Sequence, residues 1–255
     1  MTGAQATSSA TGADDRLAAL EAGSAEARTL AEALAIDHTV LLRAAVPSAS
    51  PALREAAATA QQLGILKRMA AIGDALATHA PSPVLEALGD HRSDTVRGWW
   101  CFALAADRSR SNAELLAAAL PRIDDELFTV REWVWMALRP RLVDDLPGAI
   151  ALLEPLTQHA SPNVRRFASE ALRPRGVWAQ HISEFKQRPE LGEPLLEPLR
   201  ADSARYVQDS VANWINDASK TSPDWARSLC ARWNAQSPTA ETARITKRAL
   251  RTIGQ

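Results

Sequence analysis

Three carboxylates, Glu132, Glu170 and Asp217, occur in segments of this chain that also carry arginine or tryptophan. Arginine binds phosphate through parallel hydrogen bonds, so a surface built from these segments would suit a phosphate backbone. A carboxylate repels such a ligand, and it is useful there only if something positive has to be stabilised. The residue types therefore indicate a phosphate-binding face that also stabilises developing positive charge.

The segments that carry these residues repeat along the chain. Val-Arg-Gly-Trp at 96–99, Val-Arg-Glu-Trp at 130–133 and Val-Arg-Arg-Phe at 164–167 follow one another at intervals of 34 residues, and Val207 begins a fourth copy. Self-similarity at this period is typical of stacked helical repeats, in which each unit buries its apolar stripe against its neighbours. The aromatic residue that ends each of the first three motifs is expected in the core.

Charged residues on the predicted helices fall into rows. Over residues 163–172, helical spacing puts Arg166, Glu170 and Arg173 on one face, and the repeat puts Arg139 in the place of Arg173. Two interpretations remain open. The row is either an ion-pair ladder worth a few tenths of a kcal/mol or an exposed functional face.

The following copy places Asn213 on the same row, with Asp217 one turn beyond it. Trp135, Trp178 and Trp214 lie near these rows. An indole can pack on a sugar or a base and can attract a cationic base through its ring quadrupole. The rows therefore combine groups that suit a nucleic acid.

The composition favours helices as the elements that position these residues. Ala and Leu dominate, Gly is scarce, and most of the 15 Pro lie at the ends of periodic segments. We predict an all-α fold, a HEAT-like α-solenoid of about five or six antiparallel helical pairs. The predicted pairs are 84–88 with 96–105, 113–120 with 127–138, 146–156 with 163–172, 179–199 (broken near Pro189) with 206–219, and 224–234 with 240–250.

Serine before proline marks several predicted helix starts. Ser161-Pro162, Ser222-Pro223 and Ser237-Pro238 each place a capping residue before a proline at the first helical position. These signals set the beginnings of three of the predicted helices.

The predicted domain organisation is simple. Residues 1–23 are expected to form a disordered leader because they are small and polar. Residues 24–255 are expected to form a single HEAT-like domain, with irregular helical N-terminal cap helices over 24–90 and repeats over 91–255.

The net charge of −1 by itself argues for no polyanionic partner, but the charges are unevenly distributed. Residues 1–40 carry six acidic side chains against two basic ones. Residues 161–188 carry six basic against two acidic, and residues 225–255 six basic against one acidic. This asymmetry suits a nucleic-acid face on the second half, although ordinary solvated helix faces would produce it equally well.

Other chemistries find no support in the sequence. The five His show no paired ligand spacing, so we predict no metal and no cofactor. Cys101 and Cys230 lie in separate apolar segments and are expected to be buried thiols of a reducing cytoplasm. No apolar run approaches the roughly 20 residues that span a bilayer. We expect a cytoplasmic monomer without a membrane partner.

Three motifs resemble the bacterial DNA alkylation-repair glycosylases of the AlkC/AlkD superfamily, and the AlkC branch is closer. They are Val-Arg-Glu-Trp-x-Trp-x-Ala-Leu-Arg-Pro at 130–140, Ser-Pro-Asn-Val-Arg-Arg-Phe-Ala-Ser-Glu-x-x-Arg-Pro-Arg at 161–175, and Tyr-Val-Gln-Asp-Ser-Val-Ala-Asn-Trp-x-Asn-Asp at 206–217. The likeness covers roughly residues 92–253. It implies a HEAT-like solenoid whose basic concave face binds duplex DNA, and excision of cationic N3- or N7-alkylated purines without base flipping.

The resemblance assigns roles to the carboxylates. Glu170 matches the glutamate of the family's Ser-Glu-x-x-Arg-Pro motif, and Asp217 matches the aspartate of its Asn-Asp pair, so both are expected to be active-site acids. Typical AlkC sequences have another glutamate where this chain has Trp135, and Glu132, about one turn away, is the candidate third acid. An alkylated purine cation leaves without a general acid, so the acids would stabilise the oxocarbenium-like sugar and orient water.

The partner implied by the resemblance is double-stranded DNA containing alkylated bases. The residues expected to contact it are Arg139, Arg166, Arg173, Arg175, Trp135, Trp178, Asn213 and Trp214. Arg139 and Arg173 precede proline and could instead bond the last carbonyls of their helices. Two other functions remain open, a non-catalytic HEAT-repeat protein that binds damaged or branched DNA and a protein-interaction scaffold.

Overall fold

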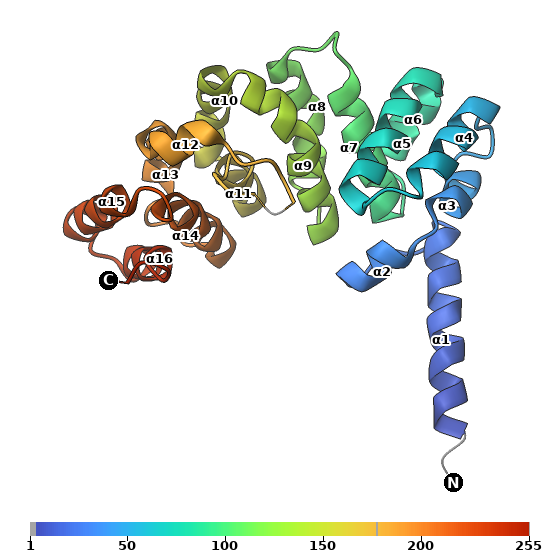
Figure 1. Cartoon of the computed structure of the whole chain (residues 1–255), viewed down its shortest axis with the longest axis horizontal. Coiled ribbons are helices and arrows are strands. Elements are labelled where there is room, and N and C mark those ends of the chain that lie inside the picture. The colour runs from blue at the N-terminus through green and yellow to red at the C-terminus, as the bar shows by residue number, and fades with distance from the viewer. Residues whose placement is uncertain (1–3, 177, 255) are drawn as a thin grey trace. The chain divides into compact units, whose positions relative to one another are not determined.

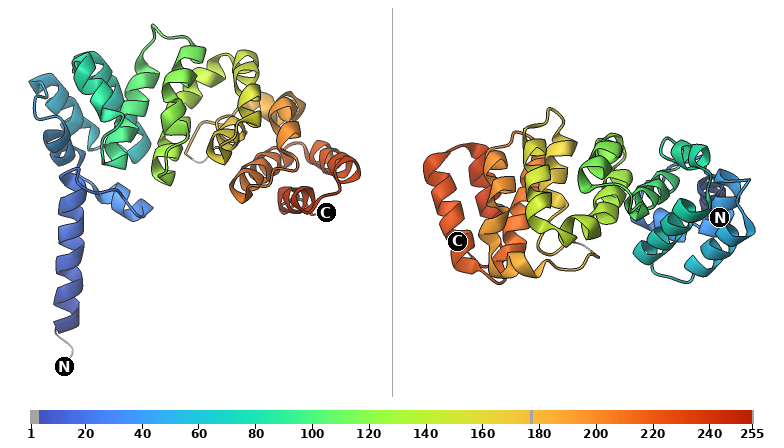
Figure 2. Two further views of the ribbon diagram at one scale, coloured as in Figure 1. Left: turned by 180° about the vertical axis from the view of Figure 1, so that it is seen from behind. Right: turned by 90° about the horizontal axis from the view of Figure 1, so that it is seen from above.

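The computed structural model describes the backbone of residues 4–176 and 178–254, and the side chains of residues 12–176 and 178–254. All regular structure in these ranges is helical, as the HEAT-like prediction requires, and within each unit neighbouring helices pack side by side (Figures 1 and 2). The chain divides into two compact units, and the single domain expected over 24–255 stays a prediction. Each unit is described by itself below.

Unit 1 consists of Met1–Ser111 and Glu126–Ala137. Its interior is built where α5 packs against α4 and α7. Trp99 and Trp133, which end two of the repeated motifs, are 0% and 4% exposed, so the prediction that they lie in the core is confirmed. Its helices are α1 (Ala4–Glu21), α2 (Leu30–Ala35), α3 (His38–Ala45), α4 (Pro51–Ala60), α5 (Ile65–His79), α6 (Ser82–Leu88), α7 (Asp94–Ala106) and the first part of α9 (Phe128–Asp144).

Glycine permits the close approach of helices in unit 1. A Cβ at Gly98 would come within 2.7 Å of the Trp133 ring, and one at Gly73 would collide with Phe102 of α7. Real Cβ atoms do not come that close, so only glycine lets α5 and α7 reach their observed distance.

The start of the chain differs from the sequence-based expectation. A disordered leader was predicted over residues 1–23, whereas the structure has helix α1 over Ala4–Glu21; residues 1–3 lie outside the described residues. Leu20 is 1% exposed, and the Arg16 guanidinium bonds the carboxylate of Glu32 at 3.2 Å. The end of this segment is thus held by contacts with later residues, which local composition does not reveal.

Unit 2 consists of Asn112–Asp125 and Leu138–Gln255. Helix α14 lies at its centre and packs against α11, α15 and α16. Its α-helices are α8 (Asn112–Ile123), the second part of α9, α10 (Leu146–Leu153), α11 (Pro162–Glu170), α12 (Ser183–Gln187), α13 (Glu193–Leu196), α14 (Arg205–Ser219), α15 (Pro223–Gln236) and α16 (Ala240–Ala249), and its 3-10 helices are η1 (Glu154–Gln158), η2 (Pro189–Gly192) and η3 (Glu197–Leu199).

Proline has two different effects in unit 2. The helix predicted to end at Leu138 continues through Pro140 to Asp144. Proline lacks one N–H, so it removes a single hydrogen bond. Leu138 and Leu142 are 1% and 2% exposed on the same face, and their burial stabilises the extra turn. The segment predicted over 179–199, with a break near Pro189, is divided into α12, η2, α13 and η3, and a proline stands at the first or second position of each of the last three pieces.

The three serine-proline signals have different outcomes. Ser161 caps α11, and its hydroxyl accepts a hydrogen bond from the Asn163 N–H at 3.2 Å, as predicted. Ser222 occupies the N-cap of α15, but its hydroxyl donates to the Lys186 carbonyl. Ser237 does not begin the last helix, because Thr239 caps α16. A serine-proline pair therefore locates a helix start to within about two residues.

Candidate functional site

Glu170 is the last residue of α11, and its side chain is almost fully buried, with 3% of the residue exposed. Its Oε1 accepts a hydrogen bond from Arg173 Nη1 at 2.8 Å and lies 3.5 Å from Arg166 Nη2. Its Oε2 accepts from the Ser210 hydroxyl of α14 at 2.6 Å. Both oxygens of this buried carboxylate therefore have partners that favour the charged form.

The charge state of Glu170 follows from these contacts. Burial alone would raise the pKa of the carboxyl, but the positive charges of Arg166 and Arg173 and the hydrogen bond from Ser210 outweigh it. The pKa of Glu170 lies below its ordinary value. The side chain is thus a carboxylate at neutral pH and cannot act as a general acid there.

Asp217 of α14 binds the same guanidinium as Glu170. It is 4% exposed, and its Oδ2 accepts from Arg173 Nε at 3.1 Å and from Nη2 at 2.7 Å. The two carboxylates and burial act on Arg173 in opposite directions, and the pKa of the guanidinium is raised. The structure therefore brings together the two acids predicted from the motifs and joins them through one arginine.

Helix geometry explains this arrangement. Arg166 and Arg173 lie four residues before and three after Glu170, and the chain leaves α11 at Ala171. Ser210 and Asp217 lie seven residues apart, so α14 presents both on one side, opposite α11. The ion-pair ladder proposed for α11 does form, and α14 extends it with a second acid.

Arg139 does not reach the surface, contrary to its predicted role on phosphates. It is 3% exposed and donates to the carbonyls of Ala171, Arg173 and Gln180 at 2.8, 2.7 and 3.0 Å. Burial, together with the repulsion from Arg173, lowers its pKa to about 10, so it stays charged. Arg139 instead holds the loop after α11 in place.

Arg166 is also committed to internal partners. It is 8% exposed, and its guanidinium lies over the ring of Tyr206, 4.7 Å from the centroid. Arg173 is likewise committed, because it bridges the two acids. Of the four predicted arginines, this leaves Arg175 nearest to a surface role. Arg175 is half-buried, and its Nε donates to the Asp217 carbonyl at 3.2 Å. Most of the predicted phosphate-binding arginines are thus part of the interior of unit 2.

Two of the predicted DNA-contacting indoles are buried. Trp214 is 0% exposed, donates to the Leu172 carbonyl at 3.1 Å and packs edge-on against Phe185. A Cβ at Gly192 would collide with its ring. Trp135 is 1% exposed. Neither indole can stack on a base or a sugar, because the core already covers both faces.

Trp135 and Glu132 form a pair within unit 1. The Trp135 Nε1 donates to Glu132 Oε2 at 2.8 Å, so the indole that stands in place of a family glutamate fixes the neighbouring carboxylate. Glu132 itself is half-buried. Its role as a third acid stays a prediction.

Trp178 and Asn213 remain accessible in unit 2. Trp178 is 51% exposed and adopts a positive φ of 59°, which is uncommon for a residue with a side chain. Asn213 is half-buried, and its Oδ1 accepts from Arg251 Nη2 at 3.0 Å. The exposed indole of Trp178 is the one that can contact a ligand.

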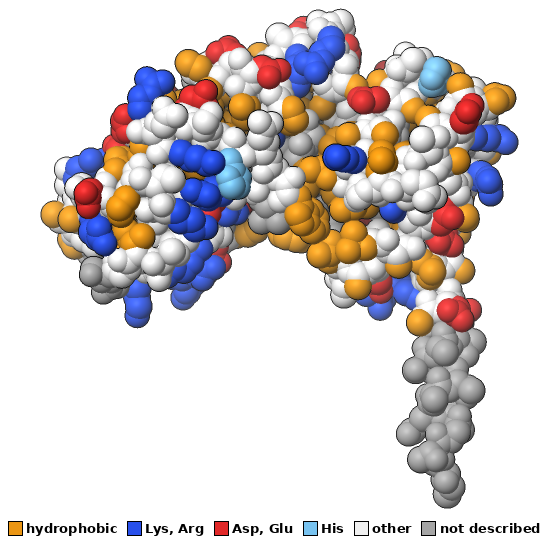
Figure 3. All heavy atoms as spheres, viewed as in Figure 1, with side chains coloured by type: hydrophobic (Ala, Val, Ile, Leu, Met, Phe, Trp, Pro, Cys, Tyr) orange, Lys and Arg blue, Asp and Glu red, His pale blue; other side chains and the backbone are white. Residues whose placement is uncertain are grey.

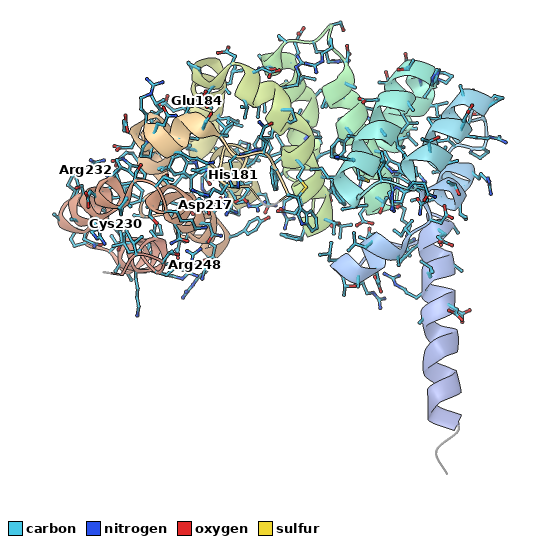
Figure 4. All side chains as sticks on the ribbon, in the orientation of Figure 1. His181, Glu184, Asp217, Cys230, Arg232 and Arg248 are labelled. Atoms are coloured by element: carbon cyan, nitrogen blue, oxygen red, sulfur yellow. The ribbon has the colours of Figure 1, made fainter. Side chains whose placement is uncertain are left out.

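A group of cations lies around Asp217, and sequence reasoning identified only Arg175 among them. We call it the basic strip, and Figure 3 shows it as blue side chains on unit 2, beside and below the histidine that Figure 4 labels His181. Its members come from the loop after α11, from α12, from α14 and its end, and from the end of α16. They are Arg175, Lys186, Lys220, Arg248 and Arg251.

Electrostatic effects on nearby groups confirm that this charge is concentrated. Partial burial and the neighbouring Lys186 and Arg175 lower the pKa of His181. Partial burial and the neighbouring Arg248 likewise lower the pKa of Arg251. Burial is the main cause of both lowered pKa values, and the neighbouring cations add to it, as expected of a surface that attracts anions.

The sequence held a signal for this strip. The excess of basic residues over 225–255 was recognised, but it was not resolved into positions. On α16, Arg244 and Arg248 both bind Asp209 of α14, at 2.7 and 3.3 Å. Their i,i+4 spacing, continued one turn further by Arg251, could have marked the face that borders α14.

Metal and thiol chemistry find no basis in the described part of the chain. No group of His, Cys, Asp or Glu there could hold a metal ion, and no helix there is both long and apolar enough to cross a membrane. Cys101 and Cys230 are buried free thiols, as predicted, and burial raises the pKa of Cys230 to about 12. Such a thiol is not nucleophilic at neutral pH.

Comparison with known proteins supports the fold assignment. A family model described as HEAT repeats matches residues 81–173. The chain is 40% identical over 128 residues to the uncharacterized protein YhaZ of Bacillus subtilis (strain 168), a match that covers 50% of this chain and 35% of YhaZ.

Solved structures similar to this chain include two helical DNA-repair or related proteins. One is the Pseudomonas fluorescens alkylpurine DNA glycosylase AlkC, bound to DNA containing an abasic site analog, with a TM-score of 0.70 and 26% identity over 94% of this chain and 62% of AlkC. The other is AlkD2 from Streptococcus mutans, with a TM-score of 0.62 and 18% identity over 78% of this chain and 97% of AlkD2. The chain thus spans less than two thirds of YhaZ and of AlkC. The predicted resemblance to the AlkC/AlkD superfamily is confirmed.

Proposed function

We propose, from this likeness in fold to alkylpurine DNA glycosylases, that the chain is a glycosylase of DNA alkylation repair. It hydrolyses the N-glycosidic bond of cationic N3- or N7-alkylated purines in duplex DNA, without extruding the base. The observation that carries the proposal is the pair of acids, Glu170 and Asp217, held by Arg173 at the centre of the basic strip. Negative charge fixed inside a phosphate-binding surface suits a reaction that creates a cation on the sugar.

The proposed reaction does not need a general acid. Alkylation at N3 or N7 makes the purine a cation, so the bond from C1′ to the base nitrogen breaks with its electron pair moving onto a neutral leaving base. The sugar becomes an oxocarbenium-like cation, and water adds to C1′ and releases a proton. Carboxylates near C1′ stabilise that cation and orient the water. The lowered pKa of Glu170 keeps it in the form that this role needs.

Arg173 contributes by preorganisation. It holds Asp217 through two hydrogen bonds and Glu170 through one, so the acids need no reorganisation when charge develops. Its own positive charge reduces their combined charge, which allows them to lie together in a buried place. Arg173 is therefore a positioning residue in this proposal.

The basic strip takes over the phosphate-binding role that the motifs assigned to buried arginines. Lys220 is an exposed cation that approaches Asp217, Arg248 is an exposed cation on α16, and Arg251 lies near both Arg248 and Asp217. They would bind phosphates without reading the sequence. The exposed Trp178 would pack on a sugar or on the alkylated base.

Base release from alkylated duplex DNA tests the proposal. The wild type should release 3-methyladenine or 7-methylguanine, and Glu170→Gln should lower the rate by at least about 100-fold, because an uncharged amide cannot stabilise the sugar cation. Asp217→Asn should behave similarly. Glu184→Gln is the matched control, since Glu184 is an exposed carboxylate on α12 (Figure 4) and should leave the rate unchanged.

Duplex binding, measured alongside, separates chemistry from folding. Glu170→Gln should still bind the duplex with the wild-type salt dependence. Full activity of Glu170→Gln, or no base release by the wild type, would contradict the proposal.

One observation favours a second function, DNA binding without chemistry. Glu170 and Asp217 are only 3% and 4% exposed, and Trp135 replaces a further acid of the AlkC pattern. A protein of this kind would bind damaged or branched DNA with a steep salt dependence and release no base. If no DNA binds even at low salt, the chain is a protein-interaction scaffold instead.

A further inference from the structure

Unit 1 contains a cavity of about 480 Å³ that the proposed glycosylase does not use. It lies between the segment that follows α1 and the start of α9, both of which belong to unit 1. Cavities of roughly 300 to 1,000 Å³ hold small ligands in proteins. Its size therefore suits a ligand as large as a single nucleotide.

A buried carboxylate holds the two walls of this cavity together. Asp94 is 0% exposed; its Oδ1 accepts from the backbone N–H of Ala27 at 3.1 Å, and its Oδ2 accepts from the Thr129 hydroxyl at 2.6 Å. Ala27 and Thr129 both line the cavity and are far apart in sequence. The shape of the cavity is thus built into unit 1 rather than left to mobile side chains.

The cavity displays an aromatic ring to solvent. Phe128, which lines it, is 56% exposed, although a phenylalanine normally gains free energy by burial. An exposed ring at the edge of a concave site is typical of a surface on which another flat ring stacks.

Two exposed arginines supply positive charge beside that ring. Arg28 and Arg92 line the cavity, and neither guanidinium donates a hydrogen bond to a partner in the described part of the chain. Arg16 donates to Glu32 and to a backbone carbonyl. The charge of Arg28 also acts on Glu32, but its guanidinium makes no hydrogen bond to that carboxylate. The two exposed guanidinium groups are available to an anion, and a phosphate is the anion that arginine binds best.

A single carboxylate at the cavity restricts the ligand further. Glu26 lines it, and Arg97 lies 3.9 Å from its carboxylate and partly balances its charge. A lone phosphate would be repelled by Glu26, whereas the amino group of a nucleobase could donate a hydrogen bond to it. The combination favours a ligand with a flat, hydrogen-bonding ring at one end and a phosphate at the other.

We propose that this cavity binds one unstacked nucleotide. The base stacks on Phe128 with an amino group toward Glu26, and the 5′-phosphate binds Arg28 and Arg92. The nucleotide comes either from solution or from the end of a DNA strand, since both present the same chemistry. The proposal goes beyond the glycosylase, because it requires no base excision and uses no residue of unit 2.

Equilibrium binding of the full chain to two probes tests the proposal, with dAMP representing the free nucleotide and 5′-phosphorylated (dA)4 a strand end. All variants carry Arg248→Ala and Arg251→Ala, so that the basic strip does not obscure the measurement. Phe128→Ala should weaken binding about 10-fold or more, because stacking on an aromatic side chain contributes about 1–3 kcal/mol per base. Phe128→Trp should restore it.

The phosphate contact is tested separately. Arg92→Ala should weaken binding of dAMP and reduce its advantage over deoxyadenosine, which lacks the phosphate. The matched controls are Leu63→Ala and Arg43→Ala, which remove an exposed leucine and an exposed arginine of unit 1 outside the cavity. Neither control should alter the affinity.

The possible outcomes distinguish a free nucleotide from a strand end, and nucleotide binding from dimer formation. Loss of both probes in Phe128→Ala supports a site open to free nucleotides, and loss of (dA)4 alone supports a strand-end site. No binding of either probe, or equal binding by Phe128→Ala, overturns the proposal. A concentration-dependent dimer that disappears in Phe128→Ala, without nucleotide binding, would overturn it in favour of a second copy of the chain.

Failure here and failure of the glycosylase are distinguishable. Base release from alkylated duplex depends on Glu170 and Asp217 in unit 2, whereas these probes contain no alkylated base. Phe128→Ala leaves both of those acids in place.

Discussion

In unit 1 the buried Asp94 binds a backbone N–H and a threonine hydroxyl, whereas in unit 2 the buried Glu170 and Asp217 bind one guanidinium. In unit 1 His38 is also buried, and its Nδ1 accepts from the Trp99 indole at 3.1 Å. These two fully buried ionisable groups of unit 1 thus bind neutral partners. In unit 2 the buried ionisable groups neutralise one another and form a charged centre.

The difference shows how each unit tolerates charge that is removed from water. A carboxylate that accepts hydrogen bonds from neutral donors needs no nearby cation and can serve as a local structural link. Two carboxylates within reach of one arginine keep a concentrated charge, which is costly to bury but useful to a reaction. The two units should therefore respond differently to the loss of a partner and to pH.

The largest effect is expected on removing the shared cation of unit 2. Arg173→Ala leaves two buried carboxylates without their main partner, so it should lower the free energy of unfolding by about 3–5 kcal/mol, measured by urea denaturation. Arg173→Lys keeps the charge but cannot bind both acids in the same geometry. Its free energy of unfolding should therefore lie between those of the wild type and Arg173→Ala.

Lys220→Ala is the control for this change. Lys220 also approaches Asp217, at 3.5 Å, but its side chain is 41% exposed. Its loss should cost about 0.5 kcal/mol or less. If Arg173→Ala were no more harmful than Lys220→Ala, the charged centre would not contribute to folding.

A smaller effect is expected from the neutral histidine of unit 1. Burial and the nearby Arg68 lower the pKa of His38 to about 3, well below its ordinary 6.5. The unfolded chain therefore binds a proton that the folded chain does not, once the pH falls below about 6.5. Stability should fall by up to about 1.4 kcal/mol per pH unit toward acid.

The test compares urea unfolding at pH 6.5 and pH 5. His38→Gln, whose amide oxygen can still accept from Trp99, should lose most of this slope, whereas His79→Gln on the exposed end of α5 should keep it. An unchanged slope in His38→Gln would mean that other groups carry the pH dependence.

The smallest effect on stability, together with a clear effect on binding, is expected at the basic strip. Arg248→Ala and Arg251→Ala should each change the free energy of unfolding by less than about 0.5 kcal/mol, because both side chains are at the surface. Each should weaken duplex binding and reduce the slope of log affinity against log salt by about 1. Arg54→Ala, an exposed arginine of unit 1, should leave the slope unchanged.

The repeats and the two acids were predictable because both depend on local spacing. The 34-residue period located the buried Trp99 and Trp133, and the motif positions located Glu170 and Asp217. The ladder on α11 follows from i,i+3 and i,i+4 spacing alone.

The remaining errors share a tertiary cause. The sequence predicted that Arg139 is an exposed cation. Its guanidinium instead donates to backbone carbonyls 32 to 41 residues further along the chain. Trp135 and Trp214 read as indoles near a charged row, but the apolar rings pack inward because burial stabilises them more than a surface position does. No local pattern reveals which side of a helix meets its neighbour more closely.

Gly192 constrains the position of Arg173, although it does not contact either acid. It lies on a 3-10 turn and contacts the ring of Trp214, whose indole bonds the carbonyl of Leu172, the residue immediately before Arg173. Adding even one methyl group there would push the ring, then that carbonyl, and finally the guanidinium between the acids. The tolerance of the charged centre to evolutionary change is thus limited by a position that carries no side chain.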